Sequence, residues 1–350
     1  MTDTDARQES QITYQTIHRQ PADLRAMSAR ETGNITAAAA FLKPARRVFT
    51  LGIGSSHHAS QMGAWFLREA GIDAIAVHAF DALHYPDLYQ IGKDDAAVIY
   101  GHTGSTGFTR KLLDALVAAD VPVVAIGSLQ AEHPGARVIL RTTEPEGAAT
   151  YTSSHLCAMA VTAALAVELG ADNLREPLTA IPNQVETVLG KQAEIWPVAE
   201  RAVDQRIYAY GAGPNEITAT EMMIKTREAA FHKIDGMAAE QFLHGPTVAF
   251  NAGDLAVVIR VAGAASERVA AIARVNQAMG GEIWTIGAPI EGIEGLCFAL
   301  PEVPEAISGL LAVVPVQLFA SRLAALKGTN PDRFRMDDPR YEAAFRRVGF

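Results

Sequence analysis

Short runs of apolar residues, each followed by a glycine-containing turn, recur along the chain. The segment 46–55 reads Arg-Arg-Val-Phe-Thr-Leu-Gly-Ile-Gly-Ser, and the segment 205–214 reads Gln-Arg-Ile-Tyr-Ala-Tyr-Gly-Ala-Gly-Pro. Continuous apolar runs of this length, separated by helical segments such as 153–169, are typical of parallel strands covered by helices on both faces. The pattern therefore predicts an α/β fold with mainly parallel sheets.

The strand-like runs also repeat at an almost constant interval. Gly52 and Gly211 are 159 positions apart, and Gly104 and Gly263 have the same separation. Strand–glycine coincidences occur in any α/β protein, but a shared interval across several landmarks predicts two related halves. We expect an N-terminal helical segment, a first domain, a helical linker with a break at 181–183, a second domain and a C-terminal tail, with these bounds: 1–43, 44–180, 181–204, 205–326 and 327–350.

Composition and charge narrow the function classes. The 350 residues carry a net charge of −9, which gives no electrostatic footprint for nucleic acid. The two cysteines, Cys157 and Cys297, lie in apolar runs without CxxC spacing and are expected to be buried thiols of a reducing compartment. The polar N-terminus does not resemble a signal peptide, and the apolar stretch 307–326 is expected to be a buried helix. These features predict a cytoplasmic protein with no membrane or nucleic-acid partner.

Known cofactor motifs are weak or missing. The segments that begin at Gly52 and Gly211 lack the third glycine of the dinucleotide fingerprint, and the chain has no GxxxxGK[ST] motif. His57 and His58 are adjacent, but neighbouring residues on a helix point apart, so a metal site there is the weaker interpretation. The sequence therefore predicts no cofactor and no metal.

A hydroxyl-rich loop follows the strand-like run 97–100. It reads Gly101-His102-Thr103-Gly104-Ser105-Thr106-Gly107 and precedes a helical pattern. A strand-to-helix turn rich in glycine and hydroxyls suits an anion, because backbone N–H groups and the helix N-terminus can face it. Capping of the helix would explain one hydroxyl but not three. The matching segment 261–266 of the second half keeps the glycine and loses most hydroxyls, so we expect phosphate binding in the first half only.

Glu221, Lys225 and Glu228 have the spacing of one helical face. A solvated ion-pair face is the usual meaning of this spacing, although apolar neighbours leave little exposed surface. A carboxylate held on such a helix could act as a general base that takes a proton from one atom and returns it to a neighbouring one. His244, which precedes Gly245 and Pro246, could equally be a structural histidine before a turn.

At these motifs the chain resembles the sugar isomerase (SIS) domain family. It is most similar to the tandem-domain isomerase portion of glucosamine-6-phosphate synthase and its stand-alone relatives, which include amino-sugar-phosphate deaminases and fructosamine-6-phosphate deglycases. The resemblance begins at 14–21 and spans nearly the whole chain. Its most specific parts are 221–228, His244-Gly245-Pro246 and 327–332.

The resemblance implies two three-layer αβα SIS domains, a homodimer and a sugar 6-phosphate ligand. It implies that Glu228 is the proton-shuttling base, with Lys225 on the same catalytic helix, and that His244 assists ring opening from the partner subunit. The residues expected to contact phosphate or sugar are Gly54, Ser55, Ser56, His102, Thr103, Gly104, Ser105, Thr106, Ala148 and Thr150.

The chain also departs from the family pattern. It has no counterpart of the synthase's glutaminase domain, so synthesis from glutamine is not expected. Gly101 and His102 replace the usual Ser-Gln of the phosphate loop, and the last lysine is Lys327, so the family's C-terminal Schiff-base lysine has no match. The leading prediction is an isomerase or deaminase acting on a ketose or amino-sugar 6-phosphate. The alternatives are a fructosamine-6-phosphate deglycase, which would need a larger pocket near Ala148 and Tyr151, and a non-catalytic sugar-phosphate sensor.

Overall fold

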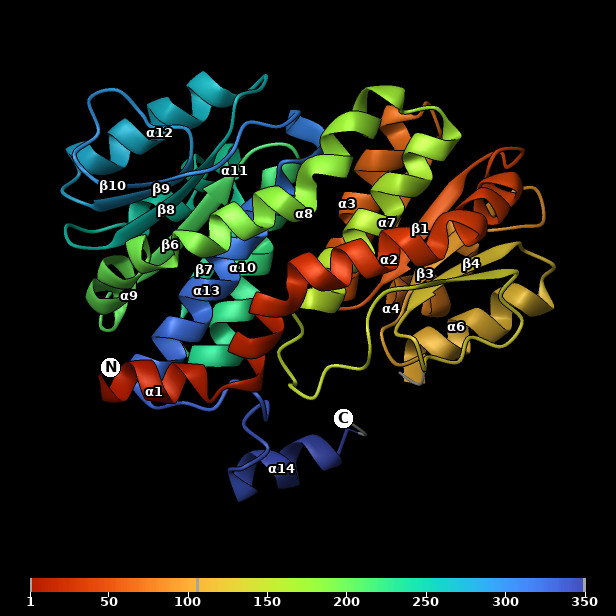
Figure 1. Cartoon of the computed structure of the whole chain (residues 1–350), viewed down its shortest axis with the longest axis horizontal. Helices are drawn as coiled ribbons and strands as arrows, with labels where there is room; N and C mark the ends of the chain where they lie inside the picture. The colour runs from red at the N-terminus through yellow and green to blue at the C-terminus, as the bar shows by residue number, and fades with distance from the viewer. Residues whose placement is uncertain (1, 105–106, 349–350) are drawn as a thin grey trace.

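The computed structural model describes residues 2–104 and 107–348, which form two α/β domains joined by long helices (Figure 1). Each domain has a five-stranded sheet, and the strand pairs in both sheets are parallel. The first sheet has the order β2-β1-β3-β4-β5. Its strands are β1 (Val48–Gly52), β2 (Ala74–His78), β3 (Ala96–Tyr100), β4 (Val123–Gly127) and β5 (Val138–Arg141).

The second sheet repeats this topology. Its order, β10-β9-β8-β6-β7, becomes that of the first sheet when β6 is matched to β1 and each later strand to its counterpart. The predicted duplication is therefore confirmed by strand order as well as by glycine spacing. These strands are β6 (Ile207–Gly211), β7 (Ile234–Ala238), β8 (Leu255–Arg260), β9 (Glu282–Gly287) and β10 (Leu296–Ala299).

Helices cover both faces of each sheet. Those of the first domain are α3 (Ser55–Glu69), α4 (Ala79–His84), α5 (Pro86–Tyr89), α6 (Gly107–Ala118) and α7 (Ser153–Leu169). Those of the second are α10 (Pro214–Ala230), α11 (Ala239–Leu243), a 3₁₀ turn at Pro246–Ala249, and α12 (Ser266–Ala278). The predicted helix at 153–169 is confirmed at both ends.

The glycines shared by the two halves have the same structural cause. Gly52 ends β1 so close to α3 that an added Cβ would lie 2.3 Å from the Ser56 carbonyl oxygen. Gly211 stands at the same place in the second domain, where an added Cβ would lie 2.5 Å from the Asn215 carbonyl oxygen. Real Cβ atoms do not approach backbone this closely, so this tight strand-to-helix turn requires glycine in both domains.

Helices from both ends of the chain and from its centre hold the domains together. They are α1 (Asp3–Glu9), α2 (Ile12–Leu42), α8 (Arg175–Gly190), α9 (Trp196–Ala202) and α13 (Gly309–Lys327), with 3₁₀ turns at Asp172–Leu174, Gln192–Glu194 and Glu305–Ile307. Arg322 of α13 pairs with Asp5 of α1 at 2.8 Å. Gln20 of α2 donates a hydrogen bond to Gln317 of α13 at 2.5 Å. The N-terminal helices thus pack against α13, whereas the last helix, α14 (Pro339–Arg346), lies apart from the body of the molecule (Figure 1).

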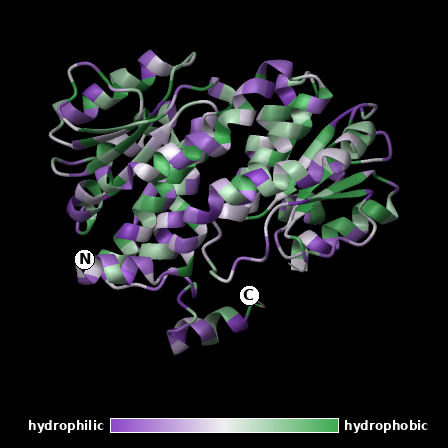
Figure 2. Ribbon diagram, in the orientation of Figure 1, coloured by the Kyte–Doolittle hydropathy of each residue, from purple (hydrophilic) through white to green (hydrophobic). Residues whose placement is uncertain are grey.

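Helix α13 explains the most apolar stretch of the sequence. The segment Glu305–Lys327 is long and apolar enough to cross a membrane, but 94% of its most apolar stretch of 18 residues is buried inside the structure. The helix contacts α10, α8, α9, α2 and α1. Figure 2 shows its apolar colouring continuing into that of the helices around it. The prediction of a buried core helix at 307–326 is confirmed.

Two details differ from the sequence prediction. Helix α8 runs through Pro182 without a break, although proline removes one backbone donor from the helix. The strands β2, β5, β7 and β10 were not predicted. All four are sheet edges, and they mix partly exposed positions with buried ones, so they lack the continuous apolar run that identified the central strands.

Candidate active site

A cavity of about 610 Å³ opens at the carboxyl ends of β1 and β3. From β1 the chain first forms β2 on one side and then β3 on the other, so the cavity lies at the topological switch point of the sheet, where α/β proteins bind ligands. Residues from the two strand ends, from helix α10 and from the C-terminal segment line it. They are Ile53, Gly54, Ser55, Ser56, Tyr100, Gly101, His102, Thr103, Thr109, Ala149, Tyr151, Lys225, Glu228, Asp332, Arg333, Phe334 and Met336.

The expected phosphate ligands form one wall of this cavity. Gly54 has the positive φ of 61° needed to turn the chain from β1 into α3, and Ser55 and Ser56 begin that helix. Thr103 joins them from the end of β3. A helix N-terminus has backbone N–H groups without helical partners, so this wall offers hydroxyl and amide donors to an anion.

Other residues that were expected to contact the phosphate or the sugar do not line this cavity. Gly104 does not line the cavity; its φ is +72°, and an added Cβ would lie 2.3 Å from the Glu132 carbonyl oxygen, so its role is to shape the loop. Ala148 is buried, and the buried Thr150 hydroxyl donates to the Pro331 carbonyl oxygen at 2.7 Å. Ser105 and Thr106 lie outside the residues that the structure describes.

Glu146 organises the turn that leads into α7. Its carboxylate accepts hydrogen bonds from the backbone N–H groups of Thr152 and Ser154, the latter at 2.7 Å. It thereby caps the N-terminus of the helix, where a negative charge is stabilising. The Glu146 backbone N–H in turn donates to His102 Nε2 at 3.3 Å. Sequence analysis did not identify this cap, because the carboxylate precedes the helix by several residues.

Glu228 and Lys225 meet at the cavity wall. Lys225 Nζ donates to Glu228 Oε2 at 2.6 Å, and the Lys225 side chain is almost completely buried. Burial raises the pKa of Glu228 above its usual value, although Lys225 partly opposes the shift. Burial also opposes the charge of Lys225, but Glu228 and Glu221 outweigh it and raise the pKa of the lysine. The cavity thus has a carboxylate of increased basicity beside a fixed cation.

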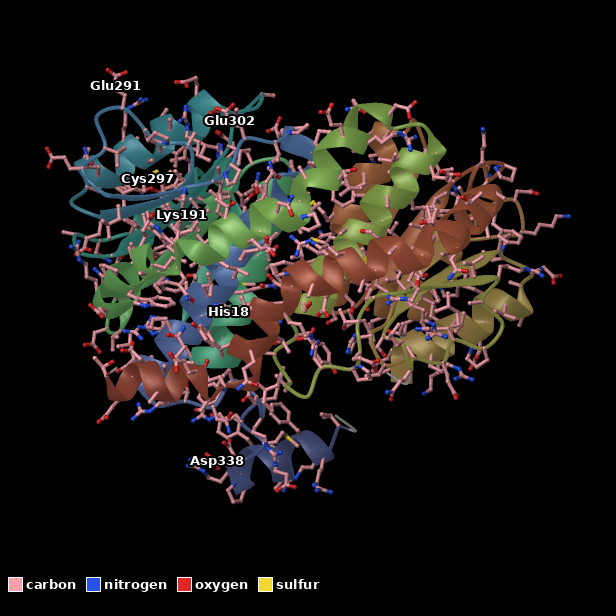
Figure 3. The ribbon with its side chains drawn as sticks, viewed as in Figure 1. His18, Lys191, Glu291, Cys297, Glu302 and Asp338 are labelled. Atoms are coloured by element: carbon pink, nitrogen blue, oxygen red, sulfur yellow. The ribbon has the colours of Figure 1, made fainter. Side chains whose placement is uncertain are left out.

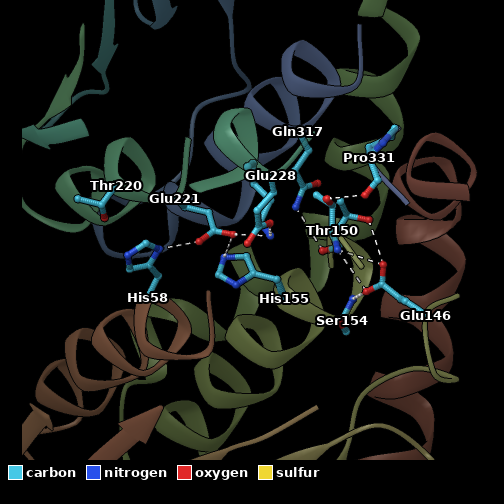
Figure 4. Close-up of polar contacts among 12 residues, drawn as sticks. His58, Glu146, Thr150, Ser154, His155, Thr220, Glu221, Glu228, Gln317 and Pro331 are labelled. Atoms are coloured by element: carbon cyan, nitrogen blue, oxygen red, sulfur yellow. Dashed lines mark hydrogen bonds and ion pairs between the residues drawn. The ribbon is translucent and has the colours of Figure 1, made fainter. Parts of the chain in front are cut away.

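Behind this pair lies a buried polar network that joins the two domains (Figure 4). Glu221 of α10 accepts a hydrogen bond from His58 Nδ1 of α3 at 2.6 Å, and its other oxygen is 3.8 Å from His155 Nε2 of α7. Burial would raise the pKa of Glu221, but its interactions with His155, Lys225 and His58 outweigh it and hold the pKa well below its usual range. Sequence analysis placed Glu221 on the helix but did not identify either histidine partner.

The C-terminal segment closes one side of the cavity. The Asp332 carboxylate accepts from the backbone N–H groups of Ile12 and Thr13, both at 2.8 Å, and so caps α2. The residues after it, Arg333, Phe334 and Met336, line the cavity before the chain reaches α14. Asp338 begins that helix, which projects from the body of the molecule (Figure 3). The chain has this segment near its end, where the family pattern has a Schiff-base lysine.

His244 lies away from the cavity of its own chain. It follows α11 on the surface of the second domain, its side chain is 73% exposed, and its nearest charged partner is Glu240 at 3.5 Å. The described residues contain no group of three or more His, Cys, Asp or Glu side chains suited to a metal ion.

In the second domain a side chain of the protein itself occupies the loop that corresponds to the hydroxyl-rich loop of the first domain. Gly263 corresponds to Gly104, but the Glu305 side chain fills the space beside it: an added Cβ at Gly263 would lie 2.2 Å from Glu305 Cδ. The backbone N–H of Ala264 donates to Glu305 Oε2 at 3.1 Å. A carboxylate of the chain itself thus stands where an external anion would be expected.

Comparison with known proteins agrees with this geometry. Residues 41–167 match the family model of the SIS domain. The chain is 28% identical over 302 residues to "Glutamine--fructose-6-phosphate aminotransferase [isomerizing]" of Pyrococcus horikoshii, covering 83% of this chain and 50% of that protein. The chain thus spans about half the length of the curated relatives it matches.

Two solved structures show the same fold. The C-terminal domain of glucosamine-fructose-6-phosphate aminotransferase from Francisella tularensis superposes with a TM-score of 0.81 at 16% identity, covering 92% of this chain and 98% of that one. Glucosamine-6-phosphate deaminase from Thermotoga maritima superposes with a TM-score of 0.75 at 19% identity, covering 92% and 97%.

The fold and the switch-point cavity define a protein of two three-layer αβα domains. The first of these domains matches the SIS domain family, and the chain as a whole resembles the isomerase portion of glucosamine-6-phosphate synthase.

Proposed function

We propose that this protein is an enzyme that acts on a ketose or amino-sugar 6-phosphate and transfers a proton between C1 and C2. One observation carries the proposal. The ion-paired Glu228 and Lys225 face the same cavity as the hydroxyls of Ser55, Ser56 and Thr103, so a base and a phosphate-binding wall share one site. Its volume of about 610 Å³ suits a small phosphorylated sugar and falls within the range of about 300–1,000 Å³ usual for such pockets.

In the proposed reaction Ser55, Ser56 and Thr103 hold the phosphate and so fix the distance to the reacting carbons. Glu228 removes the proton from one carbon of the open-chain sugar and returns it to the neighbouring carbon. Burial raises the pKa of Glu228 toward the pH at which the enzyme works. A pKa in that direction favours both removal of the proton from one carbon and its return to the other. Lys225 stabilises the carboxylate and holds its orientation without forming an imine in this scheme.

The relatives' names support the chemical class. The matched proteins include an aminotransferase described as isomerizing and a glucosamine-6-phosphate deaminase. We further propose that two copies of the chain form a homodimer and that His244, exposed on the second domain, completes the cavity of the partner copy. A deglycase acting on a fructosamine 6-phosphate is a second candidate, because Tyr151, Arg333 and Phe334 extend the cavity with aromatic and cationic surface.

The test uses NMR in deuterated water with glucosamine 6-phosphate, fructose 6-phosphate, glucose 6-phosphate and a fructosyl-amino-acid 6-phosphate. Wild type is compared with Glu228→Gln and with Glu216→Gln, an exposed glutamate of the same helix that does not line the cavity. We expect deuterium to enter C1 or C2 in wild type and Glu216→Gln, and to fall at least about 100-fold in Glu228→Gln. Absence of exchange from every sugar, with thermal stabilisation by one of them, would instead identify a sugar-phosphate sensor.

A further inference from the structure

A second, much smaller cavity adjoins the first. Its volume is about 30 Å³, and Ser55, His102 and Tyr151 line both cavities, while His155 lines only the small one. A space of roughly 10–15 Å³ by this measure is enough for one water molecule, provided that two to four polar atoms surround it. The small cavity therefore has room for one water molecule or two, but not for a sugar.

Three polar atoms from the walls of this cavity have no hydrogen-bond partner among the described residues. They are Ser55 Oγ, His102 Nδ1 and His155 Nδ1, and each is buried. Buried polar atoms in folded proteins are nearly always paired, with protein or with ordered water. Three unpaired atoms from α3, from the end of β3 and from α7 around one small space indicate a bound water.

The positions of the ring protons on the two histidines determine which ring donates a hydrogen bond to this water and which ring accepts one from it. His102 Nε2 accepts a hydrogen bond from the Glu146 N–H, so the proton of the neutral ring is on Nδ1 and can be donated to the water. Burial lowers the pKa of His155, and its Nδ1 has no hydrogen-bond partner among the described residues. The Glu221 carboxylate lies 3.8 Å from His155 Nε2 and favours the proton there, which leaves the Nδ1 lone pair free to accept from the water.

We propose that this cavity binds a single water molecule and that His155, oriented by Glu221, is the base that activates it to hydrolyse a sugar imine. The inference rests on the proposed function and makes it more specific. A carboxylate, a neutral histidine and a water in series are the elements of general-base hydrolysis. Interconversion of an aldose and a ketose consumes no water, so a fixed water with its own base has a chemical role only if a C–N bond is hydrolysed. The substrate class is therefore a sugar 6-phosphate that carries an amine at C1 or C2.

The proposed step balances without any further reactant. Proton transfer by Glu228 gives an iminium at the carbon that bears nitrogen. The water oxygen bonds to that carbon while one of its protons passes to His155 Nδ1, which gives a neutral carbinolamine. His155 returns this proton to the nitrogen, the C–N bond breaks, and the amine leaves as the remaining hydroxyl loses its proton to it. The products are the sugar carbonyl and one protonated amine.

The experiment separates proton transfer from hydrolysis. Wild type, His155→Leu and His155→Gln are incubated in deuterated water with glucosamine 6-phosphate, with a fructosyl-amino-acid 6-phosphate or with fructose 6-phosphate. Deuterium at C1 or C2 and released amine are both measured. Ser153→Ala is the matched control, because Ser153 is buried on the same helical turn and hydrogen-bonds Asp23 at 2.6 Å without lining the small cavity.

We expect wild type and Ser153→Ala to exchange deuterium and to release amine from one of the two amino sugars. Ammonia would identify an amine at C2, and a free amino acid an amine at C1. Both His155 variants should keep exchange within about 10-fold of wild type and lose amine release by about 100-fold or more. Glutamine can still hydrogen-bond to the water but cannot take its proton, so His155→Gln tests the same point if His155→Leu does not fold.

Amine release at the wild-type rate from a folded His155 variant would overturn the inference. So would a wild-type enzyme that exchanges deuterium into fructose 6-phosphate but releases no amine from either amino sugar; that result would leave the proposed isomerase function intact. Absence of exchange in wild type with all three sugars would instead defeat the proposed function itself.

Discussion

The Glu305 carboxylate accepts a hydrogen bond from the Ala264 N–H at 3.1 Å, at the loop of the second domain that corresponds to the hydroxyl-rich loop of the first. The duplication thus gives one chain two similar loops, and one of them is occupied by the chain's own carboxylate.

This relationship predicts that Glu305→Ala creates a second anion site. The variant leaves the Ala264 N–H without its acceptor, and we expect about 1 kcal/mol of lost stability from that hydrogen bond. Calorimetric titration with inorganic phosphate should show one site per chain in wild type and two in the variant. Glu302→Ala, an exposed glutamate of the same loop, is the control. Equal stoichiometry in all three proteins would contradict the prediction.

The raised pKa of Glu228 predicts the acid side of the pH profile. The base acts only when ionised, so deuterium exchange should fall as the pH decreases through a pKa above the ordinary value of 4.5. Lys225 lowers this pKa in part, so Lys225→Met should move the acid limb to still higher pH. The measurement is exchange rate against pH for both proteins. A limb that stays in place in Lys225→Met would show that another group controls it.

Lys225→Met should also destabilise the fold. It leaves two buried carboxylates, Glu221 and Glu228, without their cation, and removing one partner of a buried pair costs about 3–5 kcal/mol. The pKa of Glu228 is already raised by burial and loses the opposing effect of Lys225, so the variant should lose stability as the pH rises through this raised pKa. Urea unfolding at pH 5 and pH 8 checks the sign, and a deficit that is larger at pH 5 would refute it.

Asp332→Ala should release the C-terminal wall of the cavity. The carboxylate accepts three hydrogen bonds at the start of α2, and the loss of these should cost about 1–3 kcal/mol in total. Because Arg333, Phe334 and Met336 follow directly, we expect KM for the sugar phosphate to rise. Urea unfolding and steady-state kinetics check both effects. Asp332→Asn, which keeps one acceptor oxygen, should fall between wild type and Asp332→Ala.

Much of the fold could be predicted because the central strands are buried on both sides. The runs at 48–52, 123–127 and 255–260 are nearly all apolar, and their glycine turns repeat at one interval. The edge strands could not be predicted in the same way. The strand β10, for example, lies at the sheet edge and leaves Leu296 and Cys297 partly exposed. The predicted burial of the thiols is therefore correct for Cys157 and wrong for Cys297.

The residues of the candidate site likewise include some that the sequence could predict and some that it could not. Residues that follow central strands, such as Ser55 and Thr103, were predictable because local sequence fixes their place at the sheet edge. His58, His155 and Glu146 were not. Their roles depend on contacts between α3, α7, α10 and a distant loop, and those contacts are set by tertiary packing.

Helix α13 carries a consequence for how the protein is made. It lies near the end of the chain, yet α10, α8, α2 and α1 all pack on it. A ribosome therefore releases most of both domains before the helix that fills the space between them is available. Until then the nascent chain exposes the apolar faces of those earlier helices, which makes the interval before α13 emerges the period of greatest risk of aggregation and of greatest dependence on chaperones.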